Sequence, residues 1–390
     1  MYSESAPKSR RWFESHYAQT WLVFTLWAVP LLVIAGMVIA DPCRRSVLPV
    51  YHKAVADWWA QQNLYDGWSY HYLPQFAVLF TPFHLLPSPL GDLLWRFVSL
   101  ALLVDGLWRW SRQLFGSEVS RAFLGATLLA MPLSLGALRN GQANVVFGAL
   151  MLQAAVRLYP RQWWAASVFM MLAVAVKPIG LVLVALAAVV YAPLRWRVAL
   201  ALAALAGLPF LFNSPAYVSS QYRQMFEHIQ ACVVVAGHQY ADLGGIIRTF
   251  GGELDNVISK LVRVVAGGAV LGVWWMGARR WADPLRAMWL HALAVSYLML
   301  FNPMTESNSY VIVAPAIGLW AVWTLSKPET RRFGWVLACM GVSMGLLPTL
   351  LRPLFGNHLA LFWYPAMMII FLAMLFHFRW KLAGITVSTR

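Results

Sequence analysis

Residues 41–74 read DPCRRSVLPVYHKAVADWWAQQNLYDGWSYHYLP, a long polar and aromatic stretch in a chain that is otherwise mostly apolar. The run before it, residues 20–40, is long and apolar enough to cross a bilayer as a helix and lacks the small-residue pattern of a cleaved signal peptide. Transporters usually keep such early loops short. An enzyme that acts on lipid-linked substrates needs a carboxylate, a membrane-surface helix and aromatic side chains outside the bilayer, and this stretch contains all three.

The composition indicates an all-α polytopic membrane protein with one integral membrane domain over residues 1–390. Hydrophobic residues make up 60% of the chain and charged residues 12%, and the mean hydropathy is +0.61. A soluble fold of this length could not bury so much apolar surface. The net charge of +15 comes from small groups of Lys and Arg beside apolar runs, which is the positive-inside pattern. Nucleic acid is therefore not an expected partner.

The positions of these basic groups predict the topology. Lys8, Arg10 and Arg11 place residues 1–19 in the cytoplasm as an N-terminal tail, so the first loop, residues 41–91, is external. Apolar runs follow at residues 93–107, 122–138, 144–155, 163–176, 179–192 and 198–212, and a second external loop covers residues 213–257. We expect about twelve spans in the inner or plasma membrane, both termini cytoplasmic, and a cytoplasmic tail at residues 378–390.

Two segments of the first loop are expected at the membrane surface. From Val50 onwards, apolar residues recur at helical spacing opposite His52, Lys53 and Asp57, which is typical of an interfacial amphipathic helix. Residues 76–86 are too short to span and are interrupted by prolines, so they are predicted to be re-entrant or interfacial on the outer side. The polar motifs of the chain then all fall on the outer face, where we expect the reaction centre.

Two carboxylates compete for the role of general base. Asp41 lies at the outer mouth of the first span and could take a proton from a sugar hydroxyl, although Asp before Pro is also an ordinary helix-end residue. Glu306, in NPMTESN (302–308), lies between two apolar runs beside Asn302 and Asn308, where an ionisable residue is costly without a function. Asp242 is a third external acid.

External cations and polar side chains complete the candidate site. Lys177 precedes Pro178 at an outer helix junction; it could neutralise a departing lipid phosphate or simply extend towards water. Arg45 and Arg139 could serve the same phosphate. The candidate substrate-binding residues are Tyr51, His52, Tyr65, Tyr72, Gln142, Asn144, His238, Asp242, Asn302 and Asn308.

The three cysteines predict no metal site. Cys43, Cys232 and Cys339 form no CxxC motif and no metal-ligand spacing. Cys43 and Cys232 both fall in external loops, so a disulfide between them is one alternative. Free thiols are the expected state. No certain cofactor is indicated.

Four motifs occur in order along the first half of the chain: VYHKAVADWWAQQNLYD (50–66), YLPQFAVLFTPFHLLP (72–87), GQAN (141–144) and KPIGLVL (177–183). Together they resemble glycosyltransferase family 87, of the GT-C superfamily of membrane glycosyltransferases. The resemblance implies a GT-C-like helical bundle. It also implies an inverting transfer of mannose or another hexose from a polyprenyl-phosphate donor to a hydroxyl of a lipid or glycan at the outer, periplasmic face.

The resemblance also bears on the general base. The family's base is an acid in the first outer loop, for which Asp41 is the nearest fit, but Val47 stands where typical members carry an Asp. This departure favours Glu306 as the general base. A phosphate leaving group needs no general acid, so one external carboxylate and one or two cations would suffice. The rival interpretations are a transporter or flippase of a lipid-linked sugar, and a non-catalytic membrane scaffold.

Overall fold

The structure is a computed structural model that describes residues 8–67, 69–232, 240–279, 281 and 283–382. Within these residues every regular element is a helix, which confirms the predicted all-α class. The long helices are α1 (Lys8–Ala40), α4 (Leu90–Phe115), α5 (Val119–Arg139), α12 (Asn256–Ala278), α13 (Asp283–Phe301), α15 (Arg331–Leu350) and α17 (His358–Leu382).

The remaining helices are shorter. They are α2 (Leu48–Trp59), α3 (Pro74–His84), α6 (Ala143–Val156), α7 (Trp163–Val176), α8 (Leu181–Val190), α9 (Arg195–Gly207), α10 (Pro215–Cys232), α11 (Leu243–Thr249), α14 (Ala314–Leu325) and α16 (Arg352–Phe355). Six 3-10 turns join them: η1 (Gly116–Glu118), η2 (Pro178–Gly180), η3 (Ala192–Leu194), η4 (Leu208–Leu211), η5 (Ser307–Ile312) and η6 (Pro328–Thr330).

The described residues contain seven helical stretches that are long and apolar enough to cross a membrane, so the chain is polytopic. One stretch, Leu90–Arg139, holds both α4 and α5. Four more apolar stretches are shorter: Ala143–Val156, Trp163–Val176, Pro178–Val190 and Ala314–Leu325. The count of about twelve spans stays a prediction. Helix α1 begins at Lys8, inside the predicted N-terminal tail (1–19), and α17 ends at Leu382, inside the predicted C-terminal tail (378–390).

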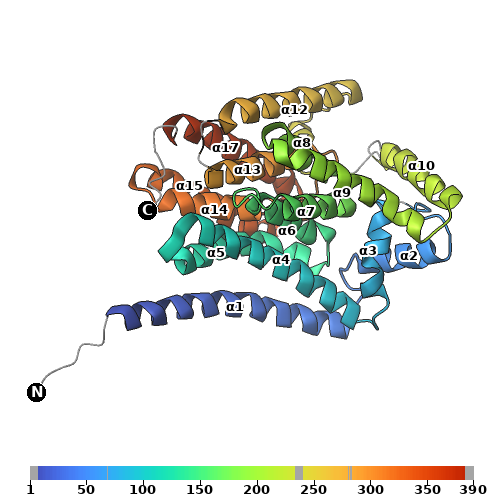
Figure 1. The fold of residues 1–390 in the computed structure, drawn as a ribbon, viewed down its shortest axis with the longest axis horizontal. Coiled ribbons are helices and arrows are strands. Elements are labelled where there is room, and N and C mark those ends of the chain that lie inside the picture. Colours follow the sequence, from blue (N-terminus) through green and yellow to red (C-terminus); the bar gives the residue numbers. More distant parts are fainter. Residues whose placement is uncertain (1–7, 68, 233–239, 280, 282, 383–390) are drawn as a thin grey trace, which may run out of the picture.

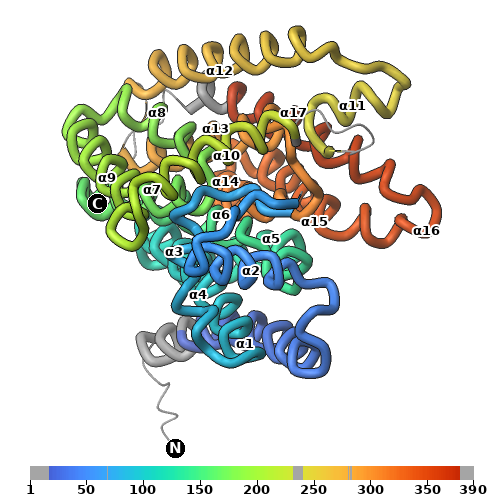
Figure 2. Tube along the Cα trace, turned by 90° about the vertical axis from the view of Figure 1, so that its right-hand side faces the viewer, coloured from blue at the N-terminus to red at the C-terminus, as the bar shows by residue number. Residues whose placement is uncertain are grey.

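Burial separates a central layer of helices from an outer one. Every residue of α6 is buried, as expected for a helix that is apolar on all sides. Close approach helps to pack this layer, because Gly318 of α14 lies against the backbone of Ala126 in α5 with no room for a side chain. In contrast, α1 and α12 expose most of their apolar residues and lie at opposite edges of the bundle (Figure 2). We expect these exposed faces to contact lipid.

The helices α2, α3 and α10 gather at one end of the bundle (Figures 1 and 2). Helix α2 buries Tyr51, Ala54, Val55 and Trp58 and packs against α3, which at 11 residues is too short to span. The sequence pattern places Asp57 on the polar face of α2, but its side chain is buried and accepts a hydrogen bond from Lys53 Nζ at 2.5 Å. The ammonium of Lys53, itself largely exposed, offsets part of the cost of burying this carboxylate.

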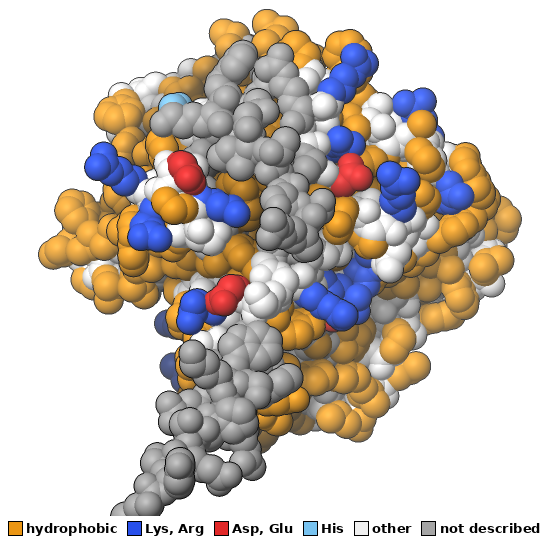
Figure 3. Space-filling view, turned by 60° about the vertical axis from the view of Figure 1, so that its left-hand side comes forward, with side chains coloured by type: hydrophobic (Ala, Val, Ile, Leu, Met, Phe, Trp, Pro, Cys, Tyr) orange, Lys and Arg blue, Asp and Glu red, His pale blue; other side chains and the backbone are white. Residues whose placement is uncertain are grey.

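The opposite end of the bundle carries many Lys and Arg side chains and few acids (Figure 3). These cations sit where helices on that side begin or end; examples are Arg112, Arg121, Arg161, Arg195, Arg279 and Arg331. The end bearing α2, α3 and α10 therefore faces away from the basic end.

Candidate active site

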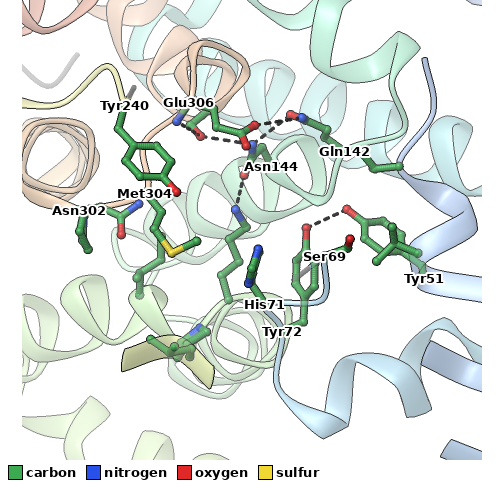
Figure 4. Close-up of a pocket in the computed structure, with 18 residues that line it drawn as sticks. Tyr51, Ser69, His71, Tyr72, Gln142, Asn144, Tyr240, Asn302, Met304 and Glu306 are labelled. Carbon is green, nitrogen blue, oxygen red and sulfur yellow. Dashed lines mark hydrogen bonds between the residues drawn. The ribbon is translucent and has the colours of Figure 1, made fainter. Parts of the chain in front are cut away.

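A cavity of about 550 Å³ opens at the end of the bundle that carries α2, α3 and α10. It forms where the ends of α6, α7 and α13 meet the segment before η5 (Figure 4). Polar and apolar side chains both line it. The lining consists of Val47, Val50, Tyr51, Ser69, His71, Tyr72, Gln142, Asn144, Lys177, Pro178, Ile179, Ile229, Tyr240, Asn302, Pro303, Met304, Glu306 and Ser309.

A chain of hydrogen bonds among lining residues connects Lys177 to Glu306 (Figure 4). Lys177 Nζ donates to Asn144 Oδ1 at 2.6 Å, Asn144 Nδ2 donates to Gln142 Oε1 at 3.1 Å, and Gln142 Nε2 donates to Glu306 Oε2 at 3.4 Å. An ammonium only donates and a carboxylate only accepts, so the direction of both amides is fixed. The two amides hold the cation and the carboxylate apart, each facing the cavity.

Gln142 and Asn144 owe their positions to the sharp end of α5. Gly141 has φ +66°, the N–H of Gly141 bonds to the carbonyl of Leu138, and the N–H of Gln142 bonds to that of Ala137. In such a helix end, one glycine in the left-handed conformation ends the helix and turns the chain away from it. Gln142 then precedes α6, so the GQAN motif directs both amides into the cavity.

Substituting Gly141 with Ala is expected to destabilise the fold and misplace Gln142. A Cβ at this position would meet Leu48 Cγ at 2.9 Å, and the left-handed backbone is itself unfavourable for alanine. We expect a loss of about 1–3 kcal/mol. The midpoint of thermal unfolding of the purified protein measures it. Gly251→Ala is the matched control, because Gly251 (φ +78°) follows α11 with the same pair of hydrogen bonds but has no neighbouring atom within 4 Å of the place that a Cβ would take.

Lys177 reaches the cavity because α7 stops before a proline. The residue preceding proline avoids the helical region, and Lys177 is extended with φ −144° and ψ 126°. Burial lowers the pKa of Lys177 to about 8, although the charge of Glu306 acts to raise it. The ammonium therefore exists near neutral pH but is poorly compensated, a state suited to binding an anion.

Glu306 is held by the turn that precedes η5. Its N–H donates to Ser309 Oγ at 3.2 Å, while the carbonyl of the preceding residue, Thr305, accepts from the N–H of Ala241 at 2.7 Å. The backbone is thus fixed on both sides, and the carboxylate, which also accepts the N–H of Ser309 in a capping box, lines the cavity. Among the described residues that line the cavity, Glu306 is the only carboxylate.

Two tyrosines form the floor beside Lys177. Tyr51 Oη lies 2.8 Å from Tyr72 Oη and accepts the N–H of Ala143 at 3.1 Å. Burial raises the pKa of Tyr51 to about 12, so its hydroxyl stays neutral. The ammonium of Lys177 lies 5.8 Å from the centre of the Tyr72 ring, within cation–π range. The floor offers hydroxyl groups and an aromatic face rather than charge.

The structure brings together seven of the residues proposed from sequence. They are Tyr51, Tyr72, Gln142, Asn144, Lys177, Asn302 and Glu306. Tyr65 supports this group from outside the cavity, since its hydroxyl donates to the carbonyl of Tyr72 at 2.9 Å. His238 lies outside the described residues.

Other candidates are placed elsewhere by local partners. Asp41 is exposed and accepts the N–H groups of Cys43 and Arg44, both at 3.1 Å, at the end of α1. His52 points away from the cavity: its Nε2 lies 2.7 Å from Asp92 Oδ1 and its Nδ1 lies 3.0 Å from His84 Nδ1. Both side chains are thus committed to structural contacts.

The remaining candidates also lie outside the cavity lining. Asp242 accepts the N–H of Gly245 as the cap of α11 and pairs with Arg248 at 3.2 Å. Arg139 donates from Nε to Asn140 Oδ1 at 3.4 Å, and Arg45 is exposed. Asn308 lies beside Gly136 of α5.

Several lining residues were not among the candidates from sequence. Ser69 and His71 belong to the aromatic run of the first loop, and their nearness to the candidate Tyr72 was the available signal. Tyr240 and Met304 come from loops with no regular pattern. Val47 also lines the cavity, so the first loop contributes an apolar side chain there.

Two other sequence expectations concern metal and thiols. Among the described residues, no group of three or more His, Cys, Asp or Glu side chains is arranged to hold a metal ion. Cys43 is an exposed free thiol, and the side chain of Cys232 lies outside the described residues.

Comparison with known proteins identifies the family of the chain. The model of glycosyltransferase family 87 matches residues 70–305, which include the lining residues Tyr72, Gln142, Asn144, Lys177 and Asn302. The chain is 27% identical over 292 residues to a polyprenol-phosphate-mannose-dependent alpha-(1-2)-phosphatidylinositol pentamannoside mannosyltransferase of Mycobacterium tuberculosis (strain CDC 1551 / Oshkosh). That alignment covers 70% of this chain and 63% of the relative, less than two thirds of its length. Because the family match extends over more than half of the 390 residues, the chain belongs to glycosyltransferase family 87.

Proposed function

We propose that this protein is a membrane glycosyltransferase. It moves mannose or another hexose from a polyprenyl-phosphate donor to a hydroxyl of a lipid or glycan acceptor at the outer face of the membrane. The observation that carries the proposal is the pairing of one carboxylate, Glu306, with one buried cation, Lys177, in the lining of one cavity. The family and the name of the mycobacterial relative support the donor class.

The chemistry follows from these two groups. Glu306 accepts the proton of the acceptor hydroxyl as its oxygen attacks the anomeric carbon. The bond from that carbon to the phosphate oxygen breaks, and polyprenyl phosphate leaves with the bonding electrons. Lys177 stabilises the negative charge that develops on the phosphate. Attack opposite the leaving group inverts the anomeric configuration, and no general acid is required.

The cavity suits a sugar phosphate in size and lining. Its volume of about 550 Å³ falls within the range of small-molecule sites. Asn302 and Gln142 offer amides to sugar hydroxyls, and Tyr72 offers an aromatic face. The apolar lining residues Val47, Val50 and Ile179 are suited to the first isoprene units of the donor.

A transfer assay tests this proposal. Purified protein is incubated with radiolabelled polyprenyl-phosphate mannose and a lipid extract that supplies acceptors. We expect label to appear in a new glycolipid in a time-dependent way. A flippase would instead move the donor between the leaflets of a proteoliposome without forming a new glycosidic bond. Movement without transfer would overturn the proposal.

The outward orientation of the cavity leads to a separate prediction. Cys43 is exposed at the cavity end of the molecule, whereas Arg121 belongs to the basic end, which the positive-inside rule places in the cytoplasm. In a chain with Cys232→Ser and Cys339→Ser, Cys43 should react with an impermeant maleimide added to intact cells. In a chain without native cysteines, Arg121→Cys should react only after permeabilisation. The reverse labelling pattern would refute the topology.

A further inference from the structure

A second cavity, of about 240 Å³, lies at the other end of the helices that form the active-site cavity. Helix α7 begins with Trp163 at the second cavity and is followed by Lys177 at the first. Helix α13 likewise begins with Asp283 at the second cavity and is followed by Asn302 at the first. A helix of 14 residues such as α7 is about 21 Å long, so the two cavities are separate sites.

The second cavity contains more positive charge than its own acid can neutralise. Asp283 lies between two guanidinium groups: Arg286 Nη1 is 3.1 Å from Asp283 Oδ1, and Arg161 Nη2 is 3.9 Å from Asp283 Oδ2. The longer distance exceeds hydrogen-bond length, so Arg161 keeps donors available. Arg286 also donates from Nη2 to the carbonyl of Trp281, while its buried Nε has no partner among the described residues.

The backbone places Arg161 here at a cost to local structure. The N–H of Gln162 bonds to the carbonyl of Arg157 and that of Arg161 to the carbonyl of Leu158, which is the left-handed helix end normally made by glycine. Arg161 has φ +58° at the glycine position. An arginine is unfavourable there, yet it puts a guanidinium at the mouth of the cavity.

The aromatic residues around this cavity are typical of the headgroup level of a membrane. Trp163 and Tyr191 line the cavity with their ring centres 5.8 Å apart, and such amphipathic rings concentrate at the headgroup region. The cavity lies where α7 and α13 begin, at the basic end of the bundle, where anionic headgroups would be attracted. Its volume is below the usual range for a sugar-lipid substrate but admits one phosphate group.

We propose that Arg161 and Arg286 form a binding site for a phosphate group at the end of the molecule opposite the active site. Guanidinium groups bind phosphate oxygens through paired, charge-assisted hydrogen bonds, and the donors left over by Asp283 are available for this. The phosphate can come from an anionic lipid headgroup or from free phosphate, and the experiment below separates these sources. The site takes no part in sugar transfer.

The test is the Arg161→Gly variant in purified, detergent-solubilised protein. Glycine suits the left-handed backbone, so the variant without ligand should unfold at the same temperature as the unmodified protein or a higher one. Short-chain phosphatidylglycerol should raise the unfolding midpoint of the unmodified protein in a saturable way. In Arg161→Gly the dissociation constant should increase at least about tenfold, because a charge-assisted pair is lost. Diacylglycerol, which lacks the phosphate, should have no such effect.

Two control variants separate the guanidinium from other changes. Gln61→Gly relieves the same backbone conformation, with φ +54°, at the far end of the molecule. Arg121→Gln removes an exposed cation at the basic end that is paired with Glu118, away from the cavity. Both should bind phosphatidylglycerol like the unmodified protein.

The outcomes decide the proposal and the source of the phosphate. Inorganic phosphate that competes fully with phosphatidylglycerol at equal affinity identifies a free-anion site. Lipid binding that millimolar phosphate does not displace identifies a headgroup site. Equal binding by the unmodified protein and Arg161→Gly, or no saturable binding of either probe to the unmodified protein, overturns the proposal. No sugar donor is present, so these results do not depend on the glycosyltransferase assignment.

Discussion

Glu306→Gln is expected to reduce sugar transfer by about 10²–10⁴-fold, because the variant loses the group that removes the acceptor proton. Gln has nearly the same shape, and its amide oxygen can still accept a hydrogen bond from Gln142 Nε2 or from the N–H of Ser309, the two donors that reach the carboxylate. The fold and the donor site around Lys177 should therefore persist. The rate of label transfer from polyprenyl-phosphate mannose, together with the unfolding midpoint of the same preparation, measures both effects.

Asp41→Asn is the matched control for this experiment. The Asp41 carboxylate accepts only two neighbouring N–H groups in the described structure and does not line the cavity. The amide oxygen of Asn can accept the same bonds, so transfer should stay within about twofold and stability within about 1 kcal/mol. An inactive Asp41→Asn beside an active Glu306→Gln would move the base to the first loop and contradict our assignment.

The regular parts of this fold could be predicted from sequence because they depend on local pattern. The apolar run 163–176 became α7 with the same limits, and the prolines at 74, 82 and 87 predicted a short segment, where the structure has the 11-residue helix α3. Within the site, Gln142 and Asn144 follow directly from a glycine that ends α5. Lys177 follows from a proline that ends α7. These signals are encoded within a few residues.

The choice among similar candidates could not be made from sequence, because it depends on which helix ends converge. Asp41 and Glu306 are both carboxylates beside a predicted outer helix end, and they lie 265 positions apart in the sequence. Of the two, Glu306 lines the cavity and Asp41 does not. His52 has the local pattern of a ligand-binding residue, but its partner, Asp92, is 40 residues away in the sequence. Tyr240 joins the site from a loop that the turn before η5 holds through Ala241 and Thr305. Long-range packing of this kind leaves no local pattern.

The pH dependence of transfer is expected to report on Lys177. Burial favours the neutral amine, so the pKa of Lys177 lies at about 8 rather than at its usual 10.5. Below that pH the ammonium is charged and can stabilise the leaving phosphate; above it the charge is lost. The value of kcat/KM for the donor should therefore fall as pH rises through about 8, because this parameter reports ionisations of the free enzyme.

Two substitutions distinguish this ionisation from alkaline unfolding. Lys177→Arg keeps its charge throughout the accessible pH range, so the fall near pH 8 should disappear even if the overall rate is lower. Lys177→Met should lose about 10²–10³-fold in transfer at every pH, the typical effect of removing one electrostatic stabiliser. Its unfolding midpoint should change little, since relief of a buried charge offsets the lost bond to Asn144. A profile that still falls near pH 8 in Lys177→Arg would assign the ionisation to another group and remove Lys177 from the proposed mechanism.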